Sequence, residues 1–144
     1  MNEDSTKLAI VTGAARGIGL ATALMFNENG YKVAIVDNDK KEIDNLSFKN
    51  ENLKTFCFDI SNDNELEKMY SQILKWHNRI DVLVNNAGVA DFGNIEETNF
   101  TRWNEVMKTN LDGVFLCSQK AISHLKKTKG NIINIASIQV VIGI

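Results

Sequence analysis

A glycine-rich turn between an apolar run and a helical pattern constrains the fold most strongly. Residues 7–11 are apolar and partly β-branched, and residues 12–19 (TGAARGIG) follow them directly. Apolar residues then recur at helical spacing, so the glycines lie on a strand-to-helix turn. In such a turn Gly13 permits the tight bend, Gly17 leaves room for a pyrophosphate, and Gly19 lets the helix pack closely. The N–H groups at the start of the helix would face the phosphates.

An acidic residue follows the second expected strand. Residues 31–36 (YKVAIV) form another apolar run, and Asp37 stands at its carboxyl end. It follows the glycine turn by roughly 20 residues, the spacing of the acid that binds adenosine ribose hydroxyls. Its charge would repel a 2′-phosphate, so NAD is expected in preference to NADP. Two alternatives stay open: Asp37 caps the next helix, a task that Asn38 or Asp39 could perform, or Arg16 reaches a 2′-phosphate.

Strand-like and helix-like segments alternate along the rest of the chain. Further strands are expected at 53–58, 80–84 and 131–136, and helical segments at 38–50, 62–77 and 98–127. This alternation predicts an α/β fold, a Rossmann-type doubly wound parallel sheet in three layers. Residues 1–144 are expected to form one domain.

Composition argues against several function classes. The net charge of −2 and a pI near 5.7 predict no basic patch for nucleic acid or membrane. No apolar run approaches about 18 residues and no export signal is present, so a cytoplasmic protein is expected. Cys57 and Cys117 lack metal spacing and are expected to be buried, reduced thiols. His77 and His124 are expected at the surface, and no metal site is predicted.

Four further segments resemble one enzyme family. Asn85-Asn86-Ala87-Gly88 follows the fourth strand, and with the glycine turn it resembles the classical short-chain dehydrogenase/reductase family. Residues 57–60 (CFDI), 108–110 (KTN) and 132–137 (IINIAS) resemble later motifs of that family, in the same order. The resemblance covers essentially the whole chain and implies the sheet order 3-2-1-4-5.

The resemblance also implies roles for individual residues. Ser137 would hydrogen-bond the substrate carbonyl or hydroxyl, although it could instead be a helix N-cap. Asn110 would accompany a helix kink and hold a relay water on its main-chain carbonyl, although it could be a locally bonded asparagine. Residues expected to contact the cofactor are Thr12, Gly13, Arg16, Gly17, Ile18, Gly19, Asp37, Asp59, Ile60, Asn86, Ala87 and Gly88.

One family motif is absent from these 144 residues. The family places a Tyr-x-x-x-Lys helix about a dozen residues after the serine, where the tyrosine transfers the proton. Neither Tyr31 nor Tyr70 has a lysine four residues later. The chain therefore resembles the amino-terminal part of such an enzyme, ending before that helix, with the later strands missing.

Two hypotheses follow for the function. The first is an NAD-dependent oxidoreductase that interconverts a small alcohol and a carbonyl compound by hydride transfer, of which these 144 residues alone would be inactive. The second is a non-catalytic module that binds NAD or pairs with another chain. The fifth strand and the long helix would leave unpaired backbone groups and apolar surface exposed, which predicts a homo-oligomer or a poorly stable chain.

Overall fold

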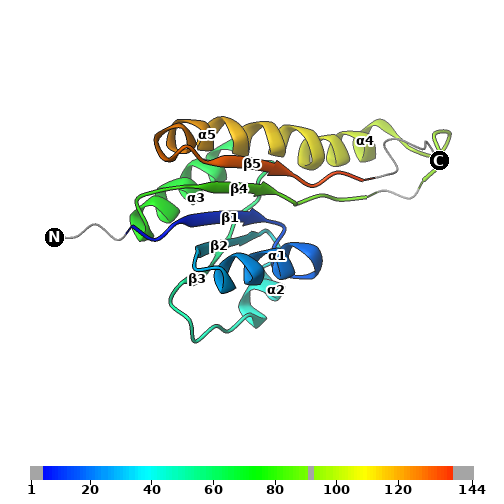
Figure 1. Ribbon diagram of the computed structural model, residues 1–144. Coiled ribbons are helices and arrows are strands. Elements are labelled where there is room, and N and C mark those ends of the chain that lie inside the picture. The colour runs from blue at the N-terminus through cyan, green and yellow to red at the C-terminus, as the bar shows by residue number, and fades with distance from the viewer. Residues whose placement is uncertain (1–4, 91–92, 138–144) are drawn as a thin grey trace.

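The computed structural model describes residues 5–90 and 93–137 as one parallel sheet with helices on both faces (Figure 1). The strands are β1 (Leu8–Thr12), β2 (Lys32–Asp37), β3 (Leu53–Cys57), β4 (Val82–Asn85) and β5 (Asn131–Asn134). Their order is β3-β2-β1-β4-β5, and every pairing is parallel. The predicted Rossmann-type order is therefore confirmed.

The helices form the two outer layers. They are α1 (Gly17–Glu28), α2 (Lys40–Asn45), α3 (Asp63–Trp76), α4 (Phe100–Met107) and α5 (Gly113–Thr128), with a π segment (Lys108–Asp112) between α4 and α5. In Figure 1, α1 and α2 cover one face of the sheet, and α3 and α5 cover the other. The strand arrows all point the same way, so the carboxyl ends of the strands form one edge of the molecule.

β1 is the centre of the core because both of its faces are covered. Leu8 and Ile10 pack into the cluster beneath α3 and α5, whereas Ala9 and Val11 pack into the cluster beneath α1 and α2. All four side chains are fully buried. This explains why β1 reads as a continuous apolar run, since a central parallel strand has no solvent-facing side.

Three helices begin at side-chain caps that the sequence supplies. Asp39 accepts a hydrogen bond from the N–H of Glu42 at the start of α2, and Asn62 accepts two at the start of α3. Asn99 caps α4 by accepting the N–H of Arg102. α1 differs, because its N-cap Arg16 makes no side-chain cap hydrogen bond.

Two expected helices are shorter or less regular than their patterns predicted. The segment 38–50 contains only the six-residue α2, because Leu46 is already extended. The long helix expected at 98–127 is interrupted by the π segment, whose Asn110 lies at its middle. An asparagine amide can bond to backbone outside its helix, and a π-type turn accommodates that bond.

Two predictions about side-chain burial were wrong: Cys57 was expected to be buried and His77 to be exposed. Cys57 is exposed, since it ends the edge strand β3 on the side away from Phe56, which faces the core. His77 is buried at the end of α3, where its Nε2 lies 2.6 Å from the carbonyl oxygen of Thr6. Cys117 is buried as expected, and His124 is half-buried. Among the described residues, no helix combines the length and apolar character needed to cross a membrane.

Candidate functional site

A cleft opens at the carboxyl edge of the sheet, where β1, β2 and β4 end. Its volume is about 210 Å³. Ligands of open α/β sheets bind at this edge, near the point where the strand order reverses. The cleft is lined by Gly13, Arg16, Val36, Asp37, Asn38, Phe58, Asp59, Ile60, Asn86, Ala87, Gly88, Val89 and Thr109.

Gly13 and Gly19 let the turn after β1 lie against the end of β4. Gly13 has a φ of 61°, and a Cβ there would stand 2.6 Å from the Cα of Ala87. A Cβ on Gly19 would stand 2.2 Å from the carbonyl oxygen of Gly13. These approaches exclude any side chain, so both glycines are required by packing.

Thr12 and Asn86 hold this turn to β4 from within. The Thr12 hydroxyl is fully buried and accepts the N–H groups of Asn86 and Ala87, each at 3.1 Å. The Asn86 amide donates to the carbonyl oxygens of Thr12 and Gly13, each at 3.0 Å. Both amide protons of Asn86 are therefore used inside the protein, so Thr12 and Asn86 shape the cleft.

The start of α1 leaves room and hydrogen-bond donors for an anion. Gly17, the first residue of the helix, has a φ of 57° and open space where a Cβ would stand. Because Arg16 provides no cap, the first N–H groups of α1 depend on water or a ligand for partners. A helix start of this kind attracts phosphate. The Ile18 side chain is 68% exposed and lines a separate apolar groove on α1, so it reaches the cleft through its backbone at most.

Asp37 presents a carboxylate at the end of β2, and its oxygens can accept further hydrogen bonds. Its Oδ2 accepts the N–H of Ala15 at 3.0 Å, and its Oδ1 accepts the N–H of Asp39 at 3.0 Å. A carboxylate has about four acceptor positions, so each oxygen can accept one further hydrogen bond. Asp39, and not Asp37, caps α2, which excludes the capping alternative for Asp37.

Arg16 is directed towards acidic side chains at the start of α2, the N-cap Asp39 and Glu42 of the first turn. Its Nη1 lies 3.1 Å from Oδ2 of Asp39 and 3.8 Å from Oε1 of Glu42. The hydrogen bond to Asp39 raises the pKa of Arg16, while the N–H of Glu42, and then Arg16, lower the pKa of Asp39. The guanidinium of Arg16, which lines the cleft, therefore lies near the carboxylates of Asp39 and Glu42 outside the lining and of Asp37 within it.

Asp59 and Ile60 line the side of the cleft that follows β3. Oδ1 of Asp59 accepts both the N–H and the hydroxyl of Ser61, while the N–H of Asp59 donates to Glu65. Ile60 is only 5% exposed, and its side chain packs closely against Gly113 of α5. The segment after β3 is thus fixed at both residues.

Asn110 joins the π segment to the loop after β4. Its Nδ2 donates to the carbonyl oxygen of Val89 at 2.8 Å, and its Oδ1 accepts the N–H of Val89 at 2.8 Å. A Cβ on Gly88 would approach that oxygen to 3.4 Å. The predicted irregularity at Asn110 is present, and its side chain clamps the part of the cleft formed by Gly88 and Val89.

Ser137 lies beyond β5, exposed, at the same carboxyl edge as the cleft. The end of β5 is held to β4 by the buried Asn85, whose Nδ2 donates to Oδ1 of Asn134 at 2.8 Å and to Oγ of Ser118 at 3.2 Å. The N–H of Ile135 continues the pairing by donating to the carbonyl oxygen of Asn85 at 2.9 Å. Ser137 does not line the cleft itself.

Several residues of the cleft were missed from the sequence. Asn38, Phe58 and Val89 each follow a strand by one or a few positions, so their place after a strand end could have indicated them. Thr109 could not be found in this way, because it reaches the cleft from the π segment. Among the described residues, no cluster of three His, Cys, Asp or Glu side chains could hold a metal ion.

Comparison with known proteins identifies relatives over nearly the whole chain. A family model described as short chain dehydrogenase matches residues 7–144. Meso-2,3-butanediol dehydrogenase of Serratia marcescens is 37% identical over 134 residues, which cover 92% of this chain and 53% of the relative. A 3-oxoacyl-(acyl-carrier-protein) reductase of Staphylococcus aureus is 35% identical over an alignment 144 residues long, which covers 96% of this chain and 58% of the relative. The chain thus spans about half the length of the curated relatives it matches.

Solved structures agree with this relationship. An apo SCOR enzyme from Clostridium thermocellum superposes with a TM-score of 0.89 at 30% identity, covering 97% of this chain and 57% of that one. A 3-ketoacyl-(acyl-carrier-protein) reductase from Brucella melitensis, complexed with NADH, superposes with a TM-score of 0.87 at 30% identity. The superposition covers 92% of this chain and 58% of that one.

Proposed function

Since this chain belongs to the short-chain dehydrogenase family, we propose that it forms the NAD-binding part of an oxidoreductase. The reaction would interconvert an alcohol and a carbonyl compound on a small-molecule substrate. The observation that supports this best is the carboxylate of Asp37 beside the uncapped start of α1, in the cleft between β1 and β2.

The residues of the cleft fit a dinucleotide. The start of α1 and the open space at Gly17 suit a pyrophosphate, and the remaining acceptor positions of Asp37 suit two ribose hydroxyls. Asp59 and Ile60 would border the adenine, while Gly13, Ala87 and Gly88 would allow the cofactor to lie close to the backbone. When bound, NAD supplies the hydride acceptor, and this chain's residues bind it and fix its position.

We propose NAD and not NADP because the charges at the ribose end are mainly negative. Arg16 is the candidate partner for a 2′-phosphate, but it already pairs with Asp39 and lies near Glu42. Asp37 would face the added phosphate directly. One pair of like charges at about 4 Å costs about 1 kcal/mol in water, and more where solvent is excluded. A preference for NAD of about tenfold or more is therefore expected.

Titration of both cofactors into the protein tests this proposal. Asp37→Ala should bring the two dissociation constants close together, because the repulsion and the ribose hydrogen bonds are lost at once. Asp44→Ala is the matched control: Asp44 is an exposed acid on α2 that pairs with Lys40 outside the cleft. Equal binding of NAD and NADP by the unaltered protein would contradict the proposal and assign the 2′-phosphate to Arg16.

Ser137 and Asn110 are the residues that we place at the reacting end. The hydroxyl of Ser137 would donate to or accept from the substrate oxygen, and the main-chain carbonyl of Asn110 would hold a water that relays a proton. The clamp between Asn110 and Val89 supports this placement, because it fixes the π segment against the loop that lines the cleft.

Turnover distinguishes an oxidoreductase from a module that only binds NAD, but the proposal expects no turnover from these 144 residues alone. General acid–base catalysis contributes about 10²–10⁴-fold, and these 144 residues contain no Tyr-x-x-x-Lys sequence to provide it. A polypeptide of these residues alone should therefore bind NAD without measurable reduction of carbonyl compounds. Rapid NADH oxidation by a preparation of verified mass would contradict this and require another acid.

A further inference from the structure

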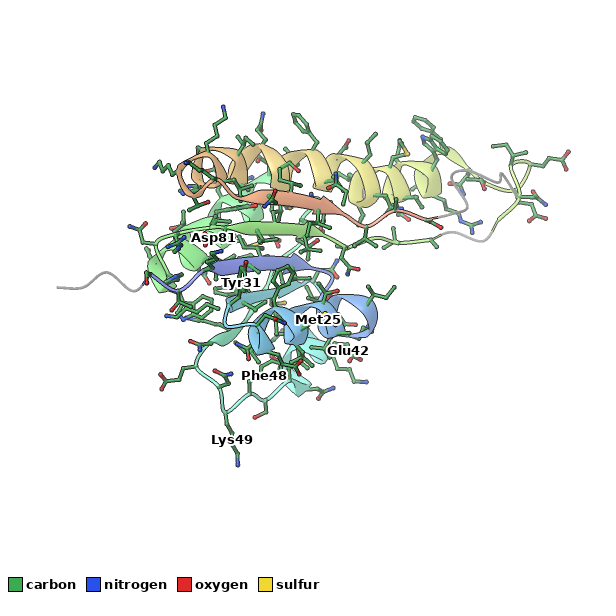
Figure 2. The ribbon with its side chains drawn as sticks, in the orientation of Figure 1. Met25, Tyr31, Glu42, Phe48, Lys49 and Asp81 are labelled. Carbon is green, nitrogen blue, oxygen red and sulfur yellow. The ribbon has the colours of Figure 1, made fainter. Side chains whose placement is uncertain are left out.

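A second cleft lies at the opposite edge of the sheet, where the strands begin. Its volume is about 780 Å³, and it is formed by the start of β2 and the ends of α3 and α5. Figure 2 places Asp81, just before β4, at this end of the molecule. Among the residues that the structure describes, the charged side chains that line the cleft are all basic: Lys32, Lys75, Arg79, Lys127 and Lys129.

This concentration of positive charge was not expected from the sequence. The net charge of −2 predicted no basic patch for nucleic acid or membrane. A net charge sums over the chain and does not report how charges are grouped, so it gave no indication of this cleft. Asp81, an acid that contacts Arg79 of the cleft lining, is 5% exposed and forms an ion pair with that arginine. Within the described ranges, no acidic oxygen lies within 4.0 Å of the exposed amines of Lys75, Lys127 or Lys129.

The ring of Trp76, which lines the cleft, holds Lys32 of the lining and one further lysine, Lys54. The amines of Lys32 and Lys54 lie over its ring, each 5.7 Å from the ring centroid. A cation over an indole face is held electrostatically, so the ring keeps these two charges on the same side of the molecule as Lys75. The group therefore draws on β2, β3 and α3, elements that are separate in sequence.

Lys129 occupies a backbone conformation that usually belongs to glycine. It ends α5 with a φ of 56°, the left-handed region that glycine adopts at helix ends without cost. It has the one positive φ of a non-glycine residue among the described residues. A lysine at this position lowers stability relative to glycine, while it places an ammonium group at the cleft.

Helix dipoles do not account for the whole cluster. Cations near the ends of α3 and α5 are favourable in themselves, which explains Lys75 and Lys127. Lys32 and Lys54 belong to strands, however, so the helix dipoles do not explain them. At position 129, glycine would end α5 with less backbone strain than lysine does. An excess of positive charge in a concave site favours an anionic ligand.

We propose that this basic cleft binds a small anion with two or more adjacent phosphate groups. Lysine ammonium groups bind phosphate as mobile point charges, and clustered phosphates would neutralise amines that reach the cleft from separate elements. The volume lies within the range of small-molecule sites. Inorganic polyphosphate and a nucleoside triphosphate share this chemistry, and the site is distinct from the cofactor cleft at the other edge of the sheet.

Calorimetric titration of the full chain with inorganic tripolyphosphate, at about 0.15 M salt, tests the proposal. Each lysine removed should weaken binding about fivefold, the effect of one charge pair at about 4 Å in water, so Lys75→Gln with Lys127→Gln should weaken it about 25-fold. Lys49→Gln is the matched control, because Figure 2 shows Lys49 at the tip of the loop before β3, and it should bind as the unaltered chain does. A parallel titration with ATP distinguishes the two possible ligands. If ATP binds more tightly than tripolyphosphate, the ligand is a nucleotide; if the two bind equally, the ligand is a free polyphosphate.

Lys129→Gly separates binding from a structural role. This change should raise the melting temperature by relieving the left-handed backbone and should weaken tripolyphosphate binding about fivefold. Amide shifts in an NMR titration should concentrate at residues 75–79 and 127–130. An absence of binding, unchanged affinity in the double variant, or shifts confined to residues 13–19 would each overturn the proposal.

Discussion

At the residue scale, the places of Gly13 and Asp37 in the cleft follow from local features of the chain. Gly13 and Asp37 are set by a backbone conformation or a strand end, and both can be read from neighbouring residues. The partners of Arg16 could not be read in this way. Asp39, 23 residues further along the chain, caps α2, and Glu42 lies within that helix, so both contacts depend on how the short helix docks. Long-range contacts therefore decided what local patterns left open.

Substituting Gly13 should be far more damaging than substituting another left-handed glycine. Gly13→Ala adds a Cβ 2.6 Å from the Cα of Ala87 at a φ of 61°, whereas Gly30→Ala meets a φ of 84° in open space. The left-handed backbone alone costs about 1–2 kcal/mol, and the clash adds about 1–3 kcal/mol. Urea unfolding of both variants checks this, and equal losses would show that the turn can move away from β4.

Buried Cys117 should make the protein sensitive to alkali. Burial raises the pKa of its thiol to about 12, whereas the unfolded thiol ionises near pH ~8.5. The unfolded chain then binds fewer protons above that pH, so stability falls as pH rises. The expected loss is about 2 kcal/mol between pH 7 and pH 10. Urea unfolding at both pH values measures this loss of stability. Cys117→Ala should reduce the loss, whereas the control Cys57→Ala should not. An equal loss between about pH 7 and pH 10 in the unaltered protein and both variants would contradict the role of Cys117.

At the element scale, strand positions were predicted well and helix regularity was not. All five strands lie where the sequence predicted them. The buried strands β1, β2 and β4 are nearly continuous apolar runs, because a parallel strand covered on both faces needs one. The outer strands β3 and β5 contain polar residues and are mostly exposed or half-buried. Helical periodicity alone gave no sign of the π segment, and the kink at Asn110 was predicted only from the family resemblance. The side chain of Asn110 bonds to Val89 in the loop after β4, a contact that periodicity does not report. A helical periodicity reports the buried face and not the partners of a single polar side chain.

The clamp between Asn110 and Val89 should control the order of the loop after β4. Asn110→Ala removes both hydrogen bonds, which contribute about 0.5–1.5 kcal/mol each, although alanine favours helix by several tenths of a kcal/mol. Faster amide hydrogen exchange at Val89 and weaker NAD binding are expected. Asn104→Ala, on the exposed surface of α4, is the control. Unchanged exchange at Val89 would show that the loop is held by other contacts.

At the scale of the whole molecule, the described residues leave many large apolar side chains exposed on α4, the π segment and α5. α4 has no buried residue, and the apolar side chains exposed on α4, the π segment and α5 include Phe100, Trp103, Leu111, Phe115 and Ile122. On β5, which pairs with β4 and ends the sheet order, Ile133 is 41% exposed. Large exposed apolar patches mark interaction sites or aggregation-prone surfaces, and an open strand edge can pair with another chain.

We therefore expect this polypeptide to self-associate through α4, α5 and β5. A stable interface buries at least about 1,000 Å² in total, and at about 25 cal/mol per Å² the aromatic side chains of that face dominate the gain. Light scattering at micromolar concentration should give at least twice the 16.1 kDa of one chain.

Phe115→Glu should shift the scattering mass towards one chain, because a carboxylate cannot be buried there without a partner. Met25→Glu is the matched control: Met25 is 65% exposed, against 60% for Phe115, but it lies on α1 on the other face of the sheet (Figure 2). A monomeric unaltered chain with a sharp melting transition would show that this apolar face needs no partner, and association abolished equally by both substitutions would place the interface elsewhere.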